Sequence, residues 1–320
     1  MLLAGDVGGT KTLLGLFEAT PGRPRARVTR SYPTASYSRF TDILDAFLAD
    51  AGGAAGIDAT AIGVAGPVVG QRAIVTNIGW AVDRDAVLRH LGARACCVLN
   101  DLEAMATSVD VLDSSELLTL QDGTPDPSGN AVVMAAGTGF GVSFLHWTNG
   151  RRMPISGEAG HTDFSARTEA ELALVAMLRQ QFGRATLEYV LSGQGLVHLH
   201  RLTHRDRQCS AIDAHALTPA AVSQVAMSGD CQACGEALAM FVDAYGSEAG
   251  NVALRTLPAA GLYVGGGIAP KILPALQDGR FMRAFRDKDP MQDLVARFPV
   301  KVILNQEAGL LGAAVAASRI

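Results

Sequence analysis

Residues 2–17 read LLAGDVGGTKTLLGLF, an apolar run, a glycine turn and a second apolar run. This pattern predicts strand, turn and strand, because apolar residues continue beyond the glycines until Pro21 and Pro24 end the run. In a dinucleotide-binding fold or a P-loop, the glycines would come at the start of a helix. The sequence also matches neither of these two motifs. The stretch therefore predicts two paired strands joined by a glycine turn.

The same pattern returns in residues 132–145, which read VVMAAGTGFGVSFL. The pair Gly137-Thr138 follows Gly9-Thr10 by roughly 130 residues, far beyond the period of about 20 to 50 residues that solenoids and propellers show. A repeat of this length predicts a duplicated domain, and two such halves facing each other would make a cleft.

Composition excludes several classes of protein. The chain has 320 residues, 48% apolar and 18% charged, which indicates a core-rich soluble protein of about two domains. A net charge of −4 without a Lys/Arg-rich run argues against a nucleic-acid partner. No apolar run approaches the length of a membrane span, and the amino terminus lacks the basic start of a signal peptide. We therefore expect no membrane partner, and five cysteines, an odd number, predict reduced thiols in the cytoplasm.

Strands and helices alternate along the first part of the chain, which predicts the α/β class with a mainly parallel or mixed sheet. The predicted strands are 60–67, 95–99, 261–264 and 300–304. The predicted helices are 41–49, 83–91, 102–112, 169–182, 186–191, 219–226, 229–257 and 309–317.

Three glycine turns, at Gly8-Gly9, 137–139 and 265–267, are candidates for binding an anion. Backbone N–H groups there can approach a ligand without an intervening side chain, and the third turn precedes a predicted helix amino terminus. A single turn of this kind is more often just a hairpin. Three of them suit a polyphosphate.

The motifs DVGGT (6–10), ND (100–101), GTG (137–139), GEAGH (157–161) and GGG (265–267) occur in one order that resembles the bacterial glucokinase family, in the sugar kinase, actin and Hsp70 superfamily. The resemblance spans nearly the whole chain. It extends to Ala65–Pro67, Thr76-Asn77 with Trp80, Leu191–Gly193 and Ala308–Gly312. It implies a two-domain sugar kinase/actin/Hsp70-like (ribonuclease H-like) α/β fold with an interdomain cleft. The expected smaller domain is 1–105 plus 305–320, and the larger is 106–304.

The resemblance implies an ATP-dependent hexokinase, a glucokinase of glycolysis that phosphorylates the 6-hydroxyl of glucose to give glucose 6-phosphate. It also implies glucose and ATP as partners and a cytoplasmic homodimer. Phosphoryl transfer needs a base to orient the attacking hydroxyl, and Asp101 fits because it follows a strand at the carboxyl edge of the predicted sheet. Local sequence alone equally allows Asp101 to be a helix N-cap.

Sugar hydroxyls both donate and accept hydrogen bonds, which suits carboxylates, amides and neutral histidine. Glu158 and His161 resemble the sugar-binding pair of the family, and Asn100, Asp101, Gly137 and Glu188 complete the implied set. A Glu-x-x-His pair can also ligate a metal, but a metal site would want further partners. Glu188 can equally lie on a solvated helix face.

The implied nucleotide site combines Asp6 with the glycine turns. Asp6 is expected to contact Mg²⁺ through water, although an aspartate there can also simply form a turn. The residues expected to bind ATP are Asp6, Gly8, Gly9, Thr10, Gly137, Thr138, Gly265 and Gly266. Lys11 departs from the pattern, since glucokinases of this type often carry Asn there and the related repressor, open-reading-frame and kinase family often carries Lys.

That related family usually has a zinc-binding cluster of closely spaced cysteines with a histidine. This chain has only Cys231-x-x-Cys234, in an alanine-rich helical stretch. These two thiols would supply two of the four ligands of a zinc site, so we expect them to be two helical thiols without a metal. His198, His200 and His204 stand beside arginines and are expected on a polar helix surface.

Three alternatives stay open. The chain could be a kinase for another hexose, or a catalytically inactive sugar-sensing regulatory protein of the same fold. The absence of a helix-turn-helix extension before Asp6 weighs against a regulator. An actin- or chaperone-like ATPase is the third alternative, and the loop with Glu158 and His161 argues against it.

Overall fold

The computed structural model describes residues 1–53, 56–75, 78–205 and 207–320; Thr76 and Asn77 of the resemblance lie outside them. Contacts divide the chain into two compact units. Unit 1 is Met1–Ser114, Met153–Ser156 and Asn305–Ile320, and unit 2 is Ser115–Arg152 and Gly157–Leu304. The expected domain boundaries, 1–105 with 305–320 and 106–304, stay a prediction that limited proteolysis would test.

Unit 1 is built on a five-stranded sheet of order β3-β2-β1-β4-β8. Its strands are β1 (Leu2–Val7), β2 (Lys11–Glu18), β3 (Arg25–Pro33), β4 (Ala59–Val64) and β8 (Ala95–Asn100), with β5 (Val68–Val69), β6 (Arg72–Ile74) and β7 (Ala81–Asp83) in a small second sheet. Its helices are α1 (Phe40–Asp50), α2 (Arg84–Leu91), α3 (Asp101–Ser108) and α11 (Ala308–Ala317). Strands β1 and β2 pair antiparallel, which confirms the expected strand, turn and strand. Strand β1 is parallel to β4, and β4 is parallel to β8.

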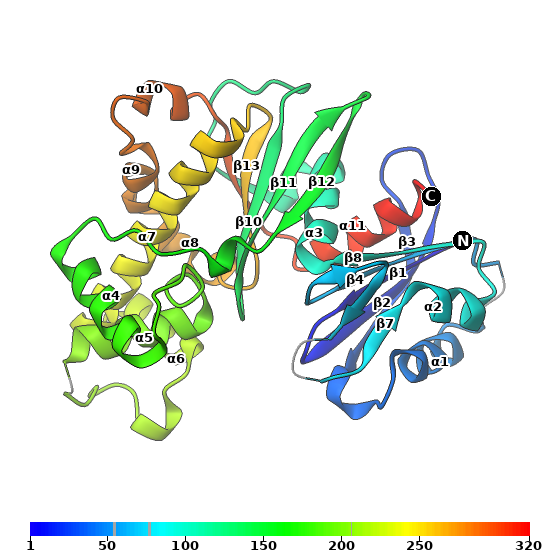
Figure 1. Cartoon of the computed structure of the whole chain (residues 1–320), viewed down its shortest axis with the longest axis horizontal. Helices are drawn as coiled ribbons and strands as arrows, with labels where there is room; N and C mark the ends of the chain where they lie inside the picture. Colours follow the sequence, from blue (N-terminus) through cyan, green and yellow to red (C-terminus); the bar gives the residue numbers. More distant parts are fainter. Residues whose placement is uncertain (54–55, 76–77, 206) are drawn as a thin grey trace. The chain divides into compact units, whose positions relative to one another are not determined.

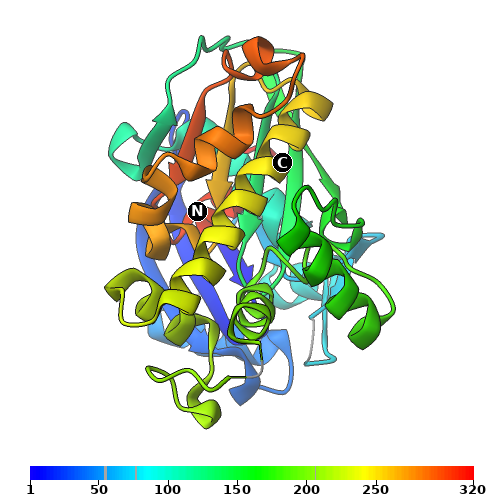
Figure 2. The ribbon, with the colours of Figure 1, turned by 90° about the vertical axis from the view of Figure 1, so that its left-hand side faces the viewer.

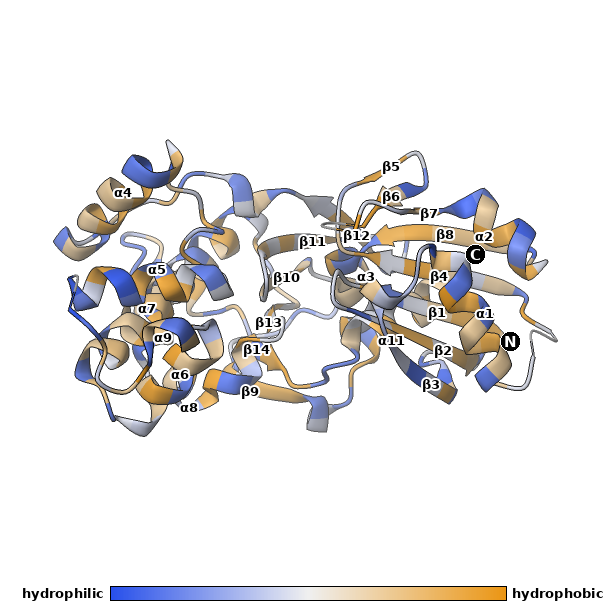
Figure 3. Cartoon of the chain, turned by 90° about the horizontal axis from the view of Figure 1, so that it is seen from below, coloured by the Kyte–Doolittle hydropathy of each residue, from blue (hydrophilic) through white to orange (hydrophobic). Residues whose placement is uncertain are grey.

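The two faces of this sheet carry different helices (Figure 1). Leu3 and Val7 of β1 pack in a cluster with residues of α1 and α2. Leu2 and Ala4 point to the other face, into a cluster with residues of α3 and α11. Figure 3 shows how strongly apolar β2 and β8 are. Because side chains alternate along a strand, Asp6 lies on the same face as Leu2 and Ala4.

Helices α3 and α11 approach closely because glycine lies at their contact. A Cβ added at Gly312 would lie 1.7 Å from the carbonyl oxygen of Ala104 and 2.7 Å from its carbonyl carbon. These atoms are backbone atoms of α3 and cannot rotate away. Gly312 therefore sets the spacing between α11 and the helix that begins at Asp101.

A six-stranded sheet of order β12-β11-β10-β13-β14-β9 belongs to unit 2, except that residues Met153–Ser156 of its edge strand β12 are counted with unit 1. Its strands are β9 (Leu117–Gln121), β10 (Ala131–Ala136), β11 (Phe140–Thr148), β12 (Arg151–Gly157), β13 (Gly261–Gly265) and β14 (Val300–Ile303). Strand β10 pairs antiparallel with β11 and parallel with β13, which is parallel to β14. The first five strands in this order repeat the arrangement of unit 1, as the duplicated Gly-Thr turns predict.

Helices of unit 2 lie along one side of its sheet (Figures 1 and 2). The helices are α4 (Glu169–Phe182), α5 (Gly193–His204), α6 (Pro219–Ser228), α7 (Gln232–Thr256), α8 (Leu273–Gln277), α9 (Arg280–Arg286) and α10 (Gln292–Val295). Figure 2 shows the long α7 crossing in front of the strands. Aromatic side chains from α7 and α9, among them Phe241, Tyr245 and Phe281, are fully buried. Within the described residues, no helix is long and apolar enough to span a membrane.

Two predicted helices of unit 2 differ from the structure. The helix expected over 186–191 is wrong, since this segment forms turns and the helix begins later, after Ser192 accepts a hydrogen bond from the Gly195 N–H at 3.1 Å. The helix expected over 229–257 begins at Gln232, because Gly229 with φ of 80° ends α6.

The expected polar surface formed by histidines of α5 is also wrong. His198, His200 and His204 are only 1%, 6% and 6% exposed. Helix α5 packs against α4, α6 and α7, so its histidines face the interior of unit 2. The arginines that suggested a surface are exposed, but only Arg201 lies within α5; Arg205 is its C-cap and Arg207 follows it.

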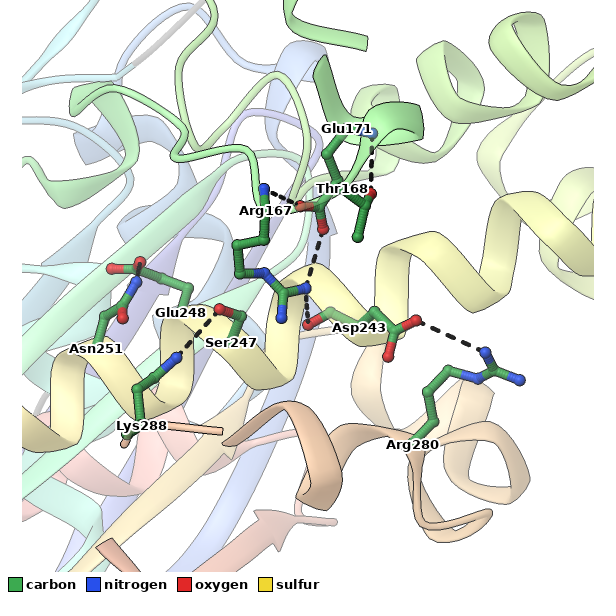
Figure 4. A network of polar contacts seen from close by, with 9 residues as sticks. All are labelled: Arg167, Thr168, Glu171, Asp243, Ser247, Glu248, Asn251, Arg280 and Lys288. Carbon is green, nitrogen blue, oxygen red and sulfur yellow. Dashed lines mark hydrogen bonds and ion pairs between the residues drawn. The ribbon is translucent and has the colours of Figure 1, made fainter. Parts of the chain in front are cut away.

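Arg167, just before α4, forms an ion pair with the buried carboxylate of Glu171 in α4 and a hydrogen bond to α7 (Figure 4). The Arg167 guanidinium donates to Glu171 Oε1 at 2.9 Å, and Glu171 is 3% exposed. The same guanidinium donates to the Asp243 carbonyl oxygen at 3.4 Å. Farther along α7, Lys288 donates to the Ser247 hydroxyl at 3.2 Å. These contacts join separate segments of unit 2 around one helix.

Arg167→Ala is expected to lower the free energy of unfolding by about 2 kcal/mol, because the Glu171 carboxylate would stay buried without its cation. The matched control is Arg39→Ala, whose own side chain is 75% exposed and whose partner Asp42 in α1 is 30% exposed, against 5% for the side chain of Glu171. The control should cost less than about 0.5 kcal/mol. Urea unfolding of both variants measures the difference, and equal losses would contradict the prediction.

Candidate active site

The carboxyl edge of the sheet in unit 1 gathers three of the predicted residues. In the register, Asp6 of β1 pairs with Gly63 of β4, and Val64 of β4 pairs with Asn100 of β8. Because the three strands are parallel, Asp6 and Asn100 lie near the same sheet edge, and Asp101 follows at once as the first residue of α3. The structure thus brings Asp6, Asn100 and Asp101 together.

Asn100, rather than Asp101, is the N-cap of α3. The Leu102 N–H donates to Asn100 Oδ1 at 3.0 Å and to Asp101 Oδ1 at 2.8 Å. The Asn100 amide also donates to the Gly66 carbonyl oxygen at 3.1 Å. Asn100 therefore fixes the start of the helix and with it the position of the Asp101 carboxyl group.

Asp6 is a carboxyl group in a poorly hydrated place. Burial raises its pKa to about 6; the charge of Asp101 adds to the rise, and Lys11 opposes it. Gly309 in α11 lies against this carboxyl group, since a Cβ there would be 2.7 Å from Asp6 Oδ2. The sequence pattern includes Gly309 only as part of a motif. It does not predict this contact, because the contact depends on how α11 packs on β1.

The first glycine turn is closed by its own backbone. The Gly8 N–H donates to the Lys11 carbonyl oxygen at 3.0 Å, and the Gly8 carbonyl oxygen accepts from the Thr34 hydroxyl at 2.8 Å. The Gly8 N–H is therefore used inside the turn. In unit 1, the candidate anion donors of this turn are the N–H groups of Gly9 and Thr10.

The other two glycine turns lie side by side in unit 2. Strands β10 and β13 are parallel neighbours with Ala135 opposite Gly265, so both turns leave the same sheet edge. The Ile268 N–H donates to the Ala136 carbonyl oxygen at 3.2 Å, and Gly266, with φ of 85°, passes so close that a Cβ would lie 2.4 Å from that oxygen. No heavy atom lies within 4 Å of a Cβ added at Gly267. The glycines of these turns have no side chains that would cover the backbone and keep a ligand away from it.

The loop with Glu158 and His161 is held beside the second glycine turn by the segment around Glu188. Glu158 Oε2 lies 3.9 Å from His161 Nε2, and both side chains are exposed. The Glu188 N–H donates to the Gly160 carbonyl oxygen at 2.9 Å. Glu188 Oε2 accepts from the Phe140 N–H at 3.1 Å, next to Gly139. Glu188 therefore joins the loop to the turn and does not lie on a solvated helix face.

Of the predicted residues, Asp6, Gly8, Gly9, Thr10, Asn100 and Asp101 belong to unit 1, and Gly137, Thr138, Glu158, His161, Glu188, Gly265 and Gly266 belong to unit 2. Each unit thus carries part of the predicted set at the carboxyl edge of its sheet or in loops beside it. Their roles stay predictions.

The model of the family described as Glucokinase matches residues 3–320. The chain belongs to the glucokinase family. The curated glucokinases of Nostoc sp. and Synechocystis sp. are each 35% identical to it, and their alignments cover 100% and 99% of this chain and 99% and 98% of the relatives.

The structure of a glucokinase from an Antarctic psychrotroph superposes with a TM-score of 0.87 at 28% identity, covering 100% of this chain and 99% of that one. A ROK family glucokinase from Streptomyces griseus, solved with glucose and AMPPNP, has a TM-score of 0.68 at 22% identity over 100% of this chain and 99% of that one. As a member of the glucokinase family, the chain has the two-domain sugar kinase/actin/Hsp70-like fold that the resemblance implied.

Proposed function

We propose that the chain is an ATP-dependent glucokinase that transfers the γ-phosphoryl group of ATP to the 6-hydroxyl of glucose, giving glucose 6-phosphate. The observation that carries the proposal is the place of Asp101 at the start of α3, at the carboxyl edge of β8, in a chain that matches the glucokinase family over residues 3–320. A carboxylate at this edge is where an α/β sheet presents a general base.

Asp101 acts in this mechanism by accepting the proton of the sugar hydroxyl as that oxygen bonds to the γ-phosphorus and the bond from phosphorus to ADP breaks. Asn100 holds the base in place through the helix cap and its hydrogen bond to Gly66. The increase in reaction rate comes mainly from positioning the reactants, because phosphoryl transfer needs little covalent help from the protein.

Glu158, His161 and Glu188 bind the sugar hydroxyls in this proposal, together with Asn100 and the backbone of Gly137. Glu188 also holds the loop of Glu158 and His161 beside the second glycine turn, a role that its hydrogen bonds to Gly160 and Phe140 support. A carboxylate fixed in this way offers acceptors of defined direction to hydroxyl groups.

The phosphates of ATP suit the backbone of Gly9, Thr10, Thr138, Gly265 and Gly266, since these turns bring N–H groups forward without bulky side chains. Asp6 and Asp101 are two carboxyl groups that repel each other in a poorly hydrated place, a donor set that suits a hydrated Mg²⁺ ion. Asp6 would hold that ion through water, and the ion, when bound, would neutralise phosphate charge.

The test of the proposal is ADP release, measured with a coupled assay across glucose, mannose, fructose, glucosamine and N-acetylglucosamine. Glucose is expected to stimulate release most strongly. A larger kcat/KM for another hexose would make the chain a kinase for that sugar. Glucose binding by calorimetry without any turnover would instead make it a sugar-sensing protein. A cytoplasmic homodimer is part of the same proposal, and sedimentation velocity measures the oligomeric state.

Glu158→Gln is expected to raise KM for glucose about 10-fold to 100-fold with a smaller change in kcat, because it weakens charge-assisted hydrogen bonds to the sugar that exist before the transition state. The matched control is Glu169→Gln, an exposed glutamate at the first position of α4. Steady-state kinetics with varied glucose measure both variants. An unchanged KM for Glu158→Gln would remove Glu158 from the sugar site.

A further inference from the structure

Three thiols and an imidazole meet in unit 2 where α5 ends and α7 begins. Cys209 Sγ lies 3.7 Å from Cys231 Sγ and 3.7 Å from Cys234 Sγ. Cys231 Sγ lies 3.4 Å from His204 Nε2. The ligand atoms of His204, Cys209 and Cys234 are all within 4.8 Å of one another. His204 and Cys209, which precede Cys231 by 27 and 22 residues, thus supply the two ligands that Cys231-x-x-Cys234 lacks.

These separations match those of ligands around one tetrahedral metal ion. Sulfurs bound to zinc at about 2.3 Å stand about 3.8 Å apart, and a sulfur and an imidazole nitrogen stand about 3.6 Å apart. A disulfide would need about 2.05 Å between two sulfurs. All five cysteines are free, and Cys209 is equally far from both other thiols, so the arrangement does not favour one disulfide pair.

The surrounding structure orients the imidazole for ligation. His204 Nδ1 lies 2.8 Å from the His200 carbonyl oxygen, so this nitrogen carries the proton and donates, and Nε2 keeps a lone pair directed toward Cys231. Such a hydrogen bond on the far side of the ring is typical of histidines that bind metals. The Thr203 hydroxyl donates to the Ala233 carbonyl oxygen at 2.8 Å, which fixes the end of α5 against the start of α7.

His200 provides a second, independent observation. Its ring is 6% exposed and stacks on His204 with ring centroids 3.8 Å apart. Both of its ring nitrogens are buried and find no hydrogen-bond partner among the residues that the structure describes. Its nearest ring nitrogen belongs to the same group of potential ligand atoms within 4.8 Å. A buried, unpartnered imidazole beside three thiols indicates a group that completes this polar cluster.

We infer that His204, Cys209, Cys231 and Cys234 bind a zinc ion in a closed, structural Cys₃His site. Three soft sulfur ligands with one nitrogen favour zinc over magnesium or calcium, which prefer oxygen. Four protein ligands leave no position for water or substrate, so the ion stabilises the fold and takes no part in phosphoryl transfer.

The ion would tie the segment 207–218 to the end of α5 and to the start of α7. Cys209 is the ligand from this segment, while His204 is the last residue of α5 and Cys231 is the N-cap of α7. At its other end, α5 begins beside the second glycine turn, where the Gly193 N–H donates to the Gly137 carbonyl oxygen at 2.8 Å. Zinc would therefore stabilise a helix that supports this turn.

The test measures the metal content of the full-length chain purified under reducing conditions without chelator or affinity metal. Mass spectrometry should find close to one zinc per chain. Cobalt exchanged into the site should give a thiolate-to-cobalt charge-transfer band and the strong visible absorption of tetrahedral coordination. Zinc at less than about a tenth of the protein concentration together with no such band after cobalt addition would overturn the inference, because a Cys₃His site binds these ions tightly.

Variants identify the ligands. Cys209→Ser, Cys234→Ser and His204→Ala should lose most of the zinc and the cobalt band. The controls are Cys97→Ser, a thiol of β8 in unit 1, and His215→Ala, an exposed histidine in the same segment 207–218 as Cys209. Both controls should keep the metal. Metal retained by Cys209→Ser and Cys234→Ser, or lost equally in both controls, would contradict the assignment.

Thiol titration separates zinc from a disulfide and does not depend on whether any variant folds. Under denaturing conditions the wild-type chain should show all five thiols, with zinc released as an organomercurial reacts with the cluster. Three titratable thiols and no released zinc would show a disulfide in this cluster and would overturn the inference.

Discussion

Asp101→Asn is expected to lower kcat for glucose phosphorylation by about 10²-fold to 10⁴-fold, the usual contribution of a general base. The amide keeps the size of the carboxyl group and still accepts a hydrogen bond from the Leu102 N–H, so α3 should begin as before. KM for glucose should change little, because the lost function operates in the transition state.

The control for this variant is Asp85→Asn, which changes the same kind of residue in the first turn of α2. Asp85 is exposed and its carboxylate forms a surface ion pair with the neighbouring Arg84, so kcat should stay within about twofold of wild type. Stopped-time assays of ADP release measure both variants, and calorimetry with glucose confirms binding. An Asp101→Asn enzyme with near-normal turnover would show that another group is the base.

Gly312→Ala is expected to destabilise unit 1 by about 3 kcal/mol, at the upper end of the cost of overpacking, and to lower kcat as well. The added methyl group would sit 1.7 Å from the Ala104 carbonyl oxygen, well inside van der Waals contact of about 3.5 Å. Helices α3 and α11 must then move apart. Since Asp101 is the first residue of α3, a shift of this helix moves the proposed base.

Gly235→Ala is the matched control, because Gly235 also lies in a helix but no heavy atom lies within 4 Å of the added Cβ. It should raise the free energy of unfolding by about 0.5–1 kcal/mol, since alanine favours helix more than glycine does. Thermal and urea unfolding measure both variants. If Gly312→Ala were as stable as Gly235→Ala, helices α3 and α11 could not be in the close contact described above.

Local sequence patterns determined most of the elements, although the strand predicted over 60–67 spans Ala59–Val64. Apolar runs interrupted by Gly-Thr predicted both pairs of antiparallel strands, and Glu169–Phe182 forms α4 with the bounds that its pattern predicts. These features depend on neighbours within a few residues, where strand alternation and helix periodicity act. Asp101 was also placed correctly after a strand and at a helix start, but the pattern could not choose between it and Asn100 as the N-cap.

Only the tertiary structure decided which distant residues meet. The sequence pattern predicted His200 and His204 on a polar surface and only the pair Cys231 and Cys234 as neighbouring thiols. Local periodicity predicts neither the packing of α5 on α7 nor the approach of Cys209. The same holds for Gly309 beside Asp6 and for Glu188 beside Gly160. By itself the sequence determined the strand and turn pattern and the residue types available for phosphoryl transfer. Packing between segments far apart in the chain decided which side chains contact each other, because burial and side-chain contact depend on the whole fold.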